Sequence, residues 1–148
     1  MTLAPNIKVK ALGLHWRGDA LLAAEIRESD GSLRGVRPLG GTVEFGETTD
    51  EALLREFQEE LGQYVTITGR PIVLENIFHF QGLPGHEIVF LYPIAFPDGA
   101  FAGTDVIHYQ EDNGENCVAR WFALDTLDVA GGLLLFPNGL KAQMQLLN

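Results

Sequence analysis

Three glutamates lie close together between Thr48 and Gly62. Glu56, Glu59 and Glu60 are spaced i, i+3 and i+4, so a helix would place their carboxylates on one face. Like charges at this spacing repel one another and cost a helix roughly a few tenths of a kcal/mol for each pair. Clustered carboxylate oxygens bind hard divalent cations, so the spacing predicts a site for Mg²⁺ or Mn²⁺. The alternative is a solvated acidic face, because glutamate is a good helix former.

The residues around these glutamates predict a capped, amphipathic helix. Thr48 followed three residues later by Glu51 matches a capping box, so we expect the helix to begin near Thr49. Gly62 is expected to end it, because glycine readily adopts the left-handed conformation of a helix C-terminus. An apolar stripe runs beside the acidic face. It consists of Ala52, Leu53, Leu54, Phe57 and Leu61.

A glycine turn and an ion pair are expected next to the acidic face. Gly40 and Gly41 let the backbone turn sharply and approach a ligand, since glycine has no Cβ. Glu47 precedes the helix cap, and Arg55 lies on the helix beside the glutamates. We expect Arg55 to orient a carboxylate, either Glu47 or Glu51, rather than to bind a substrate group.

The whole stretch from Gly41 to Gln63 resembles the Nudix box. That box reads Gly-x5-Glu-x7-Arg-Glu-apolar-x-Glu-Glu-x-Gly-apolar, a pattern far more specific than a short glycine motif. The positions in register are Gly41, Glu47, Arg55, Glu56, Phe57, Glu59, Glu60 and Gly62. Gln63 departs from the pattern, where an aliphatic residue is usual. This difference bears on packing under the end of the helix rather than on chemistry.

Composition and charge place the chain among ordinary globular proteins. Its 148 residues predict a single domain, residues 1–148, and 46% of them are hydrophobic. The net charge of −10 argues against a nucleic-acid polymer as partner, because phosphate binding needs a basic surface. No apolar run is long enough to span a membrane. The single Cys117 cannot form an internal disulfide, which fits the cytoplasm.

The remaining pattern predicts an α+β sandwich. Apolar or alternating runs predict strands over residues 7–16, 19–28, 34–39, 42–45, 70–81, 86–96 and 118–124. Residues 82–85 are expected to turn a hairpin, residues 97–115 to form a loop, and residues 139–147 to form a closing helix. Strands around two helices favour an α+β fold. This agrees with the Nudix fold, an α/β/α sandwich with a mixed β-sheet between helices, which the resemblance implies for essentially the whole chain.

The resemblance also implies an activity and a set of metal ligands. Nudix hydrolases cleave a diphosphate bond by attack of water on phosphorus. Their substrates are small nucleotide-type molecules, usually a nucleoside diphosphate linked to another group, or a nucleoside triphosphate. By resemblance, Glu56, Glu59, Glu60 and the carbonyl of Gly41 bind the cation, while Glu47 holds Arg55 in support. Many relatives form dimers, so a homodimer is compatible with the resemblance.

A further acidic ligand or base is expected from a loop outside the box. Glu115 is our first candidate, because it lies six residues before Trp121 in a run, ENCVARWFAL, similar to a Glu-to-Trp segment of the family. Glu111 and Asp112 are alternatives in the same acidic loop, and a solvent-facing carboxylate is the structural alternative for Glu115. Glu56 and Glu115 are the favoured general bases.

Substrate-binding residues are less clearly marked. Arg37 adjoins the glycine turn and is a candidate for contacting phosphate or ribose. Glu75 stands alone in a hydrophobic strand, and it is a candidate if it points into the cleft. Phe80, with Phe78, is a candidate for stacking a base, although alternating aromatics in a strand more often belong to a core.

Two other functions on the same fold are alternatives to the metal-dependent diphosphatase. One is a non-catalytic nucleotide-binding sensor, which the full set of box carboxylates disfavours. The other is an isomerase of isoprenoid diphosphates, which needs a well-placed cysteine that Cys117 does not match. Cys117 is expected to be a small buried residue.

Overall fold

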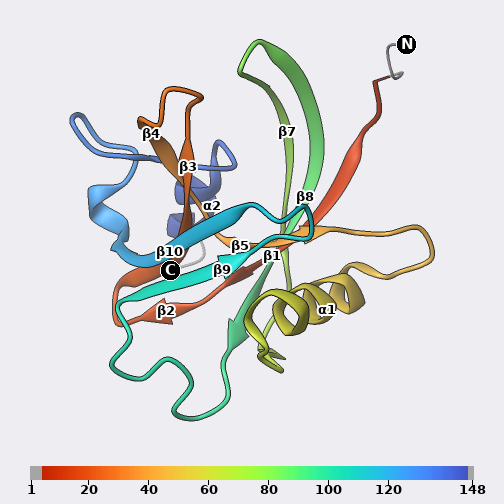
Figure 1. Ribbon diagram of the computed structural model, residues 1–148, viewed down its shortest axis with the longest axis vertical. Coiled ribbons are helices and arrows are strands. Elements are labelled where there is room, and N and C mark those ends of the chain that lie inside the picture. Colours follow the sequence, from red (N-terminus) through yellow and green to blue (C-terminus); the bar gives the residue numbers. More distant parts are fainter. Residues whose placement is uncertain (1–4, 147–148) are drawn as a thin grey trace.

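The computed structural model describes residues 5–146, which form a mixed-sheet α+β fold with two α-helices (Figure 1). The strands are β1 Lys8–Leu14, β2 Trp16–Arg17, β3 Ala20–Arg27, β4 Leu33–Arg37, β5 Leu39–Thr42, β6 Thr66–Ile67, β7 Ile72–Phe80, β8 Leu83–Ala95, β9 Val106–Gln110, β10 Asn116–Ala123 and β11 Leu134–Leu135. The helices are α1 Thr49–Leu61 and α2 Leu140–Leu146, with a 3-10 turn at Leu124–Thr126. No helix in this part of the chain is long and apolar enough to cross a membrane.

The strands form two sheets. The first has the order β5-β1-β8-β6, and β7 pairs with the N-terminal part of β8. Within it, β1 and β8 are parallel, whereas β5, β6 and β7 pair antiparallel with their neighbours. The second sheet has the order β11-β4-β3-β10-β9, with β2 paired to β3. The mixture of parallel and antiparallel pairs agrees with the fold that the resemblance implied.

The apolar core has two halves, one on each face of the strands. Side chains of successive strand residues point to opposite faces. Ala11 accordingly packs with Phe57 of α1, while its neighbour Leu12 packs with Leu140 of α2. All four side chains are almost completely buried. The two helices therefore cover opposite faces of the strands, and the predicted α/β/α sandwich is confirmed.

Helix α1 begins and ends where the sequence predicts. Thr48 is the N-cap, and it forms a reciprocal capping box with Glu51. Gly62 ends the helix in the left-handed conformation, with φ of 66°, and its N–H is bonded to the carbonyl of Gln58. The apolar stripe is narrower than expected, because Leu54 is exposed.

Two elements between the predicted strands differ from expectation. The strand expected over residues 42–45 is wrong, since β5 ends at Thr42 and Gly46 turns the chain with φ of 91°. The loop expected over residues 97–115 is also partly wrong, because it contains β9, which pairs with β10. In β9 only Ile107 and Tyr109 are buried, and this short alternation is hidden among polar neighbours.

The hairpin of β7 and β8 is longer than the sequence suggested. Its turn consists of Gln81 and Gly82, both with positive φ, so β8 begins at Leu83 rather than near residue 86. Two-residue turns of this kind match the natural twist of antiparallel strands. The hairpin extends beyond the rest of the sheet (Figure 1). Its outer half forms one wall of the cavity described below.

Candidate functional site

The site begins where β5 meets α1. Glu56 is only 5% exposed, and its carboxylate lies directly against the backbone of Gly41. A Cβ at position 41 would stand 2.6 Å from both carboxylate oxygens of Glu56, which is closer than real Cβ atoms approach. The glycine at this position therefore lets the carboxylate reach the strand. The carbonyl of Gly41 stays a predicted ligand.

Arg55 holds the acidic residues in place. Its guanidinium donates two hydrogen bonds to Glu47, from Nε at 2.7 Å and from Nη2 at 2.8 Å. Nη1 donates to Glu56 at 2.8 Å and to Glu59 at 3.3 Å. The hydrogen bonds from Arg55 lower the pKa of Glu47 to about 2, so this carboxylate stays ionised. Arg55 thus orients Glu47, as the sequence suggested, and also fixes two glutamates of the cluster.

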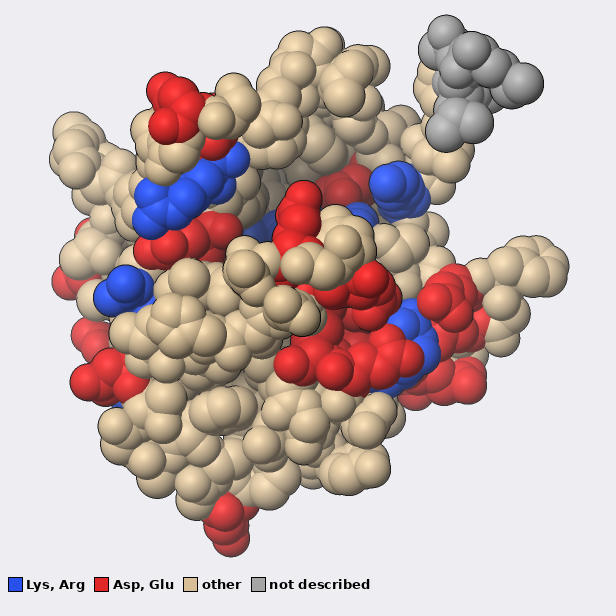
Figure 2. Space-filling model, in the orientation of Figure 1, with Lys and Arg blue, Asp and Glu red and all other residues tan. Residues whose placement is uncertain are grey.

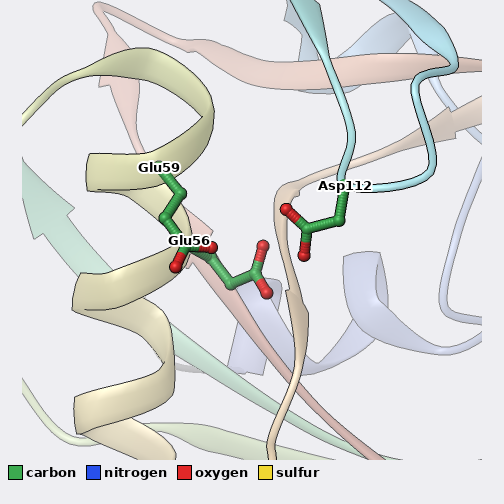
Figure 3. A group of neighbouring side chains, drawn as sticks. All are labelled: Glu56, Glu59 and Asp112. Carbon is green, nitrogen blue, oxygen red and sulfur yellow. The ribbon is translucent and has the colours of Figure 1, made fainter.

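Three carboxylates converge beside this arginine. Glu56, Glu59 and Asp112 each offer an oxygen, and these oxygens lie within 4.8 Å of one another (Figure 3). The two glutamates project from α1, while Asp112 comes from the loop between β9 and β10. Hard oxygen donors in this number and spacing fit a divalent cation such as Mg²⁺ or Mn²⁺. Figure 2 shows the carboxylates gathered on one face of the molecule.

Glu60 lies against the same cluster and shares a hydrogen bond with Glu56. Burial, followed by the interaction with Glu56, raises the pKa of Glu60 to about 9. Without a cation, the folded chain therefore keeps a proton on this pair at neutral pH. A cation would replace that proton, because metal ligands must be deprotonated.

Glu115 has a different position from Asp112. Its side chain is exposed and lines a large cavity beside the cluster, and its backbone N–H is bonded to the side chain of Asn113. Asp112, which the sequence offered as an alternative, is the loop residue placed with Glu56 and Glu59. The short turn between β9 and β10 aims the two acids differently.

The cavity beside the cluster has a volume of about 550 Å³. It lies between the β7–β8 hairpin and the strands β3, β4 and β10, where the surface is hollowed (Figure 2). Arg37 and Phe80 line it, as expected of substrate-binding residues. Glu75 does not, because it lies on the exposed face of β7, and its neighbour Asn76 faces the cavity instead.

Two cavity residues were missed by the sequence analysis. Asn76 and Glu87 are buried, and Glu87 lies 4.0 Å from the side-chain nitrogens of both Lys10 and Arg37. Burial, and then the charge of Arg37, lower the pKa of Lys10. Asn76 lies on the same face of β7 as Phe80, because side chains two or four positions apart in a strand share a face. Glu87 is the only acid in β8. These two signals could have identified both positions.

Comparison with known proteins then assigns the chain to a family. A family model described as NUDIX domain matches residues 10–141. The chain belongs to the Nudix family. No curated protein matches the sequence at a significant level. The acidic cluster described above is formed by Nudix-box residues and one loop residue, Asp112.

Solved structures of other proteins share the fold. The solution structure of the E. coli ORF135 protein matches with a TM-score of 0.60 and 21% identity, covering 96% of this chain and 91% of that one. The MutT NUDIX hydrolase from Burkholderia pseudomallei also gives a TM-score of 0.60, with 19% identity, covering 93% and 97%. At these identities the likeness concerns the fold, and the Nudix family is the basis for regarding the chain as a hydrolase.

Proposed function

We propose that this Nudix protein hydrolyses a diphosphate bond in a small nucleotide-type substrate, with Mg²⁺ or Mn²⁺ as cofactor. The observation that carries the proposal is the convergence of Glu56, Glu59 and Asp112 beside a cavity large enough for a nucleotide, which Glu111 and Glu115 from the loop of Asp112 line. A solvated acidic helix face would not need a third carboxylate from a distant loop, nor an arginine that fixes two of the three.

The cluster supplies the ligands that this chemistry needs. Glu56, Glu59 and Asp112 would hold the cation, with Glu60, Glu115 and the carbonyl of Gly41 as further proposed ligands. A divalent cation at these oxygens supplies neutralisation of the diphosphate's charge and a lower pKa for water.

The protein's own residues orient the metal-binding carboxylates and accept protons. Arg55 keeps the Glu56 carboxylate in one direction, because it is itself fixed by two hydrogen bonds to Glu47. Glu56 and Glu115 are the proposed general bases. Glu115 has free access to solvent protons, since its side chain is exposed at the edge of the cavity.

The charge of the protein shapes which partner can enter. With a net charge of −10, the chain would repel an extended polyanion, whereas a small diphosphate can arrive with its cation. We therefore propose a small phosphorylated substrate rather than a nucleic-acid polymer or a membrane. Burial raises the pKa of Cys117 to about 11, so its thiol stays protonated at neutral pH. We propose a cytoplasmic location because the single cysteine cannot form an internal disulfide.

A phosphate-release screen tests the proposal. The purified protein is incubated with nucleoside triphosphates, nucleotide sugars, ADP-ribose and dinucleoside polyphosphates, in the presence of Mg²⁺, Mn²⁺ or EDTA, with coupled enzymes that release phosphate from the products. We expect hydrolysis of one group, abolished by EDTA. Binding of these nucleotides without turnover would instead favour the sensor function. Turnover that persists in EDTA would contradict the metal-dependent reaction.

A further inference from the structure

Two buried polar side chains face the cavity without hydrogen bonds of their own. Asn76 and Glu87 stand directly opposite each other on β7 and β8, and they are 8% and 7% exposed. Over residues 5–146 the structure gives neither side chain a hydrogen bond. The two ion pairs of Glu87, with Lys10 and Arg37, both involve Oε2 at 4.0 Å, which is beyond hydrogen-bonding distance. Its Oε1 has no ion pair at all in the same residues.

The polar atoms of both side chains still reach the water of the cavity, since Trp121 Nε1 is the only fully buried side-chain polar atom without a partner in the described residues. A ligand that fills the cavity displaces this water and has to replace its hydrogen bonds. The Glu87 carboxylate can only accept hydrogen bonds, while the Asn76 carboxamide can both donate and accept. The matching ligand therefore presents O–H or N–H donors to Glu87 and a further polar atom to Asn76.

The position of this pair indicates which part of a substrate it meets. Glu87 and Asn76 line the cavity together with Glu111 and Glu115, which come from the same β9–β10 loop as Asp112 of the acidic cluster.

Aromatic side chains lie beyond the pair, toward the hairpin turn. Phe78 and Phe80 follow Asn76 on the same face of β7, and the ring of Phe78 lies over Gly85. The polar pair therefore lies between the acidic cluster and the aromatic end of the cavity. In a nucleotide, the sugar occupies the same place between phosphate and base.

We propose that Glu87 and Asn76 form a subsite for the vicinal hydroxyls of a ribose, which makes the substrate a ribonucleotide. This inference rests on the proposed diphosphatase function and names its substrate class. The Glu87 carboxylate accepts hydrogen bonds from the hydroxyls, and the Asn76 carboxamide bonds to one of their oxygens. With the ribose held there, the rings of Phe78 and Phe80 are placed to stack on the base.

Other occupants fit the pair less well. A phosphate group would be attracted by Lys10 and Arg37 but would meet the negative charge of Glu87 between them. An apolar group would leave both polar side chains buried without partners. A base edge with two N–H donors is the closest chemical competitor, but it would leave Phe78 and Phe80 beyond the base instead of beside its faces. The experiment below separates the sugar from the base.

The test compares nucleotides that differ only in the sugar hydroxyls. The values of kcat/KM are measured with Mg²⁺ for the ribo-, 2′-deoxy- and 2′,3′-dideoxynucleoside triphosphates of four bases. We expect the ribonucleotides to exceed the dideoxynucleotides by about 100-fold, because the site is built to hydrogen-bond hydroxyls that the analogues lack. In Glu87→Gln and in Asn76→Ala this ratio should fall to within about tenfold. Asn76→Ala leaves the charges of Lys10, Glu87 and Arg37 intact, so it keeps the test open if Glu87→Gln fails to fold.

A matched control comes from the neighbouring residue of the same strand. Glu75→Gln removes a carboxylate from the exposed face of β7, and we expect it to keep the wild-type ratio. Equal kcat/KM for ribo- and dideoxynucleotides in the wild type would overturn the inference while leaving the proposed function intact. A preference that follows the base and ignores the sugar would also overturn it.

Binding extends the test to a protein that does not turn these nucleotides over. If none is hydrolysed, the same series is measured by titration calorimetry with Mg²⁺. A ribose preference that is lost in Glu87→Gln would support the subsite, and the missing turnover would count against the proposed function alone. Equal affinity for all three sugars, or no binding of any of them, would overturn the subsite.

Discussion

The acidic cluster and the cavity beside it are two ends of one cleft, and they are built in opposite ways. At the acidic end, Arg55, Glu56 and Glu59 come from one helix and meet Gly41 fourteen positions upstream of Arg55. At the other end, the cavity draws Arg37, Asn76 and Glu87 from three different strands, with further residues as distant as Asn138. The first end depends on spacing along a helix and the second on register between strands. Local spacing is visible in a sequence, whereas strand register is not.

The balance of charge also differs between the ends. At the acidic end, one arginine contacts Glu47, Glu56 and Glu59, and Asp112 adds a further negative charge. At the other end, Lys10 and Arg37 share Glu87. Carboxylates therefore outnumber the arginine at the acidic end, whereas two cations flank the single carboxylate of Glu87. We therefore expect the acidic end to depend on an added cation, and the cavity end to depend on hydrogen bonds to a substrate.

The largest expected effect is a loss of turnover when a carboxylate of the acidic end is removed. Glu59→Gln should lower kcat by about 1,000-fold or more, because it removes a carboxylate oxygen from the cluster. The side chain is 42% exposed, so the melting temperature should stay within a few degrees of wild type. Phosphate release and thermal unfolding check the two outcomes. Near-normal turnover would remove Glu59 from the cation site.

Arg55→Ala should damage activity and stability together. The substitution leaves Glu56 buried without its cation and frees Glu47, which should cost roughly 2–4 kcal/mol of unfolding free energy. Turnover should fall by about 100-fold, because the cluster loses its orientation. Urea unfolding and phosphate release measure both. Arg55→Lys is the control, since it keeps the charge and loses the paired hydrogen bonds to Glu47. Full activity in Arg55→Lys would show that charge alone suffices.

The raised pKa of Glu60 predicts an unusual pH dependence for the acidic end. The folded chain holds a proton that the unfolded chain releases above pH about 4.5, and it gives that proton up only near pH 9. Without divalent cations, stability should therefore fall as pH rises through this window, by up to about 1.4 kcal/mol per pH unit.

Thermal unfolding in EDTA at several pH values measures this slope. Glu60→Gln should flatten it, because glutamine cannot lose a proton. Saturating Mg²⁺ should also flatten it, since the cation takes the proton's place. A slope that is unchanged in Glu60→Gln would assign the buried proton to another group.

The two loop acids should differ in how their loss appears. Asp112→Asn should weaken Mg²⁺ activation, seen as a rise of about tenfold in the Mg²⁺ concentration for half-maximal rate. Glu115→Gln should lower kcat by about tenfold or more and change the pH–rate profile, as expected for a base. If the profile is unchanged in Glu115→Gln, Glu56 is left as the proposed base.

The smallest effect belongs to the aromatic end. Phe80→Ala should raise KM by about threefold to tenfold through lost stacking, with kcat nearly unchanged. Its ring is also contacted by the guanidinium of Arg34 at 4.9 Å, so part of the loss would be structural. Steady-state kinetics with the substrate from the screen measure the two constants. A fall in kcat as large as the rise in KM would show that Phe80 also helps to position the reacting groups.

What the sequence could predict follows the same division. The helix limits, the hydrogen bonds of Arg55 to Glu47 and the joint placement of Glu56 and Glu59 all depend on residues of one helix and of the short segment before it. The sequence analysis ranked Glu115 ahead of Asp112, whereas it is Asp112 that lies with Glu56 and Glu59, because the directions of both acids depend on the turn between β9 and β10. Asn76 was missed in favour of Glu75, since a one-residue difference in a strand exchanges the faces. Register and turn type arise from contacts distant in sequence.

The hairpin of β7 and β8 is a part of the molecule where substitutions should be tolerated. β7 has one bonded neighbour, and Phe78 and Phe80 belong to neither half of the apolar core. Mutations at these two positions therefore carry little risk of unfolding, in contrast to changes around Phe57. Changes in this hairpin can therefore alter which substrate binds, while the acidic cluster stays the same. Substitutions should therefore be tolerated better at the hairpin than around the acidic cluster.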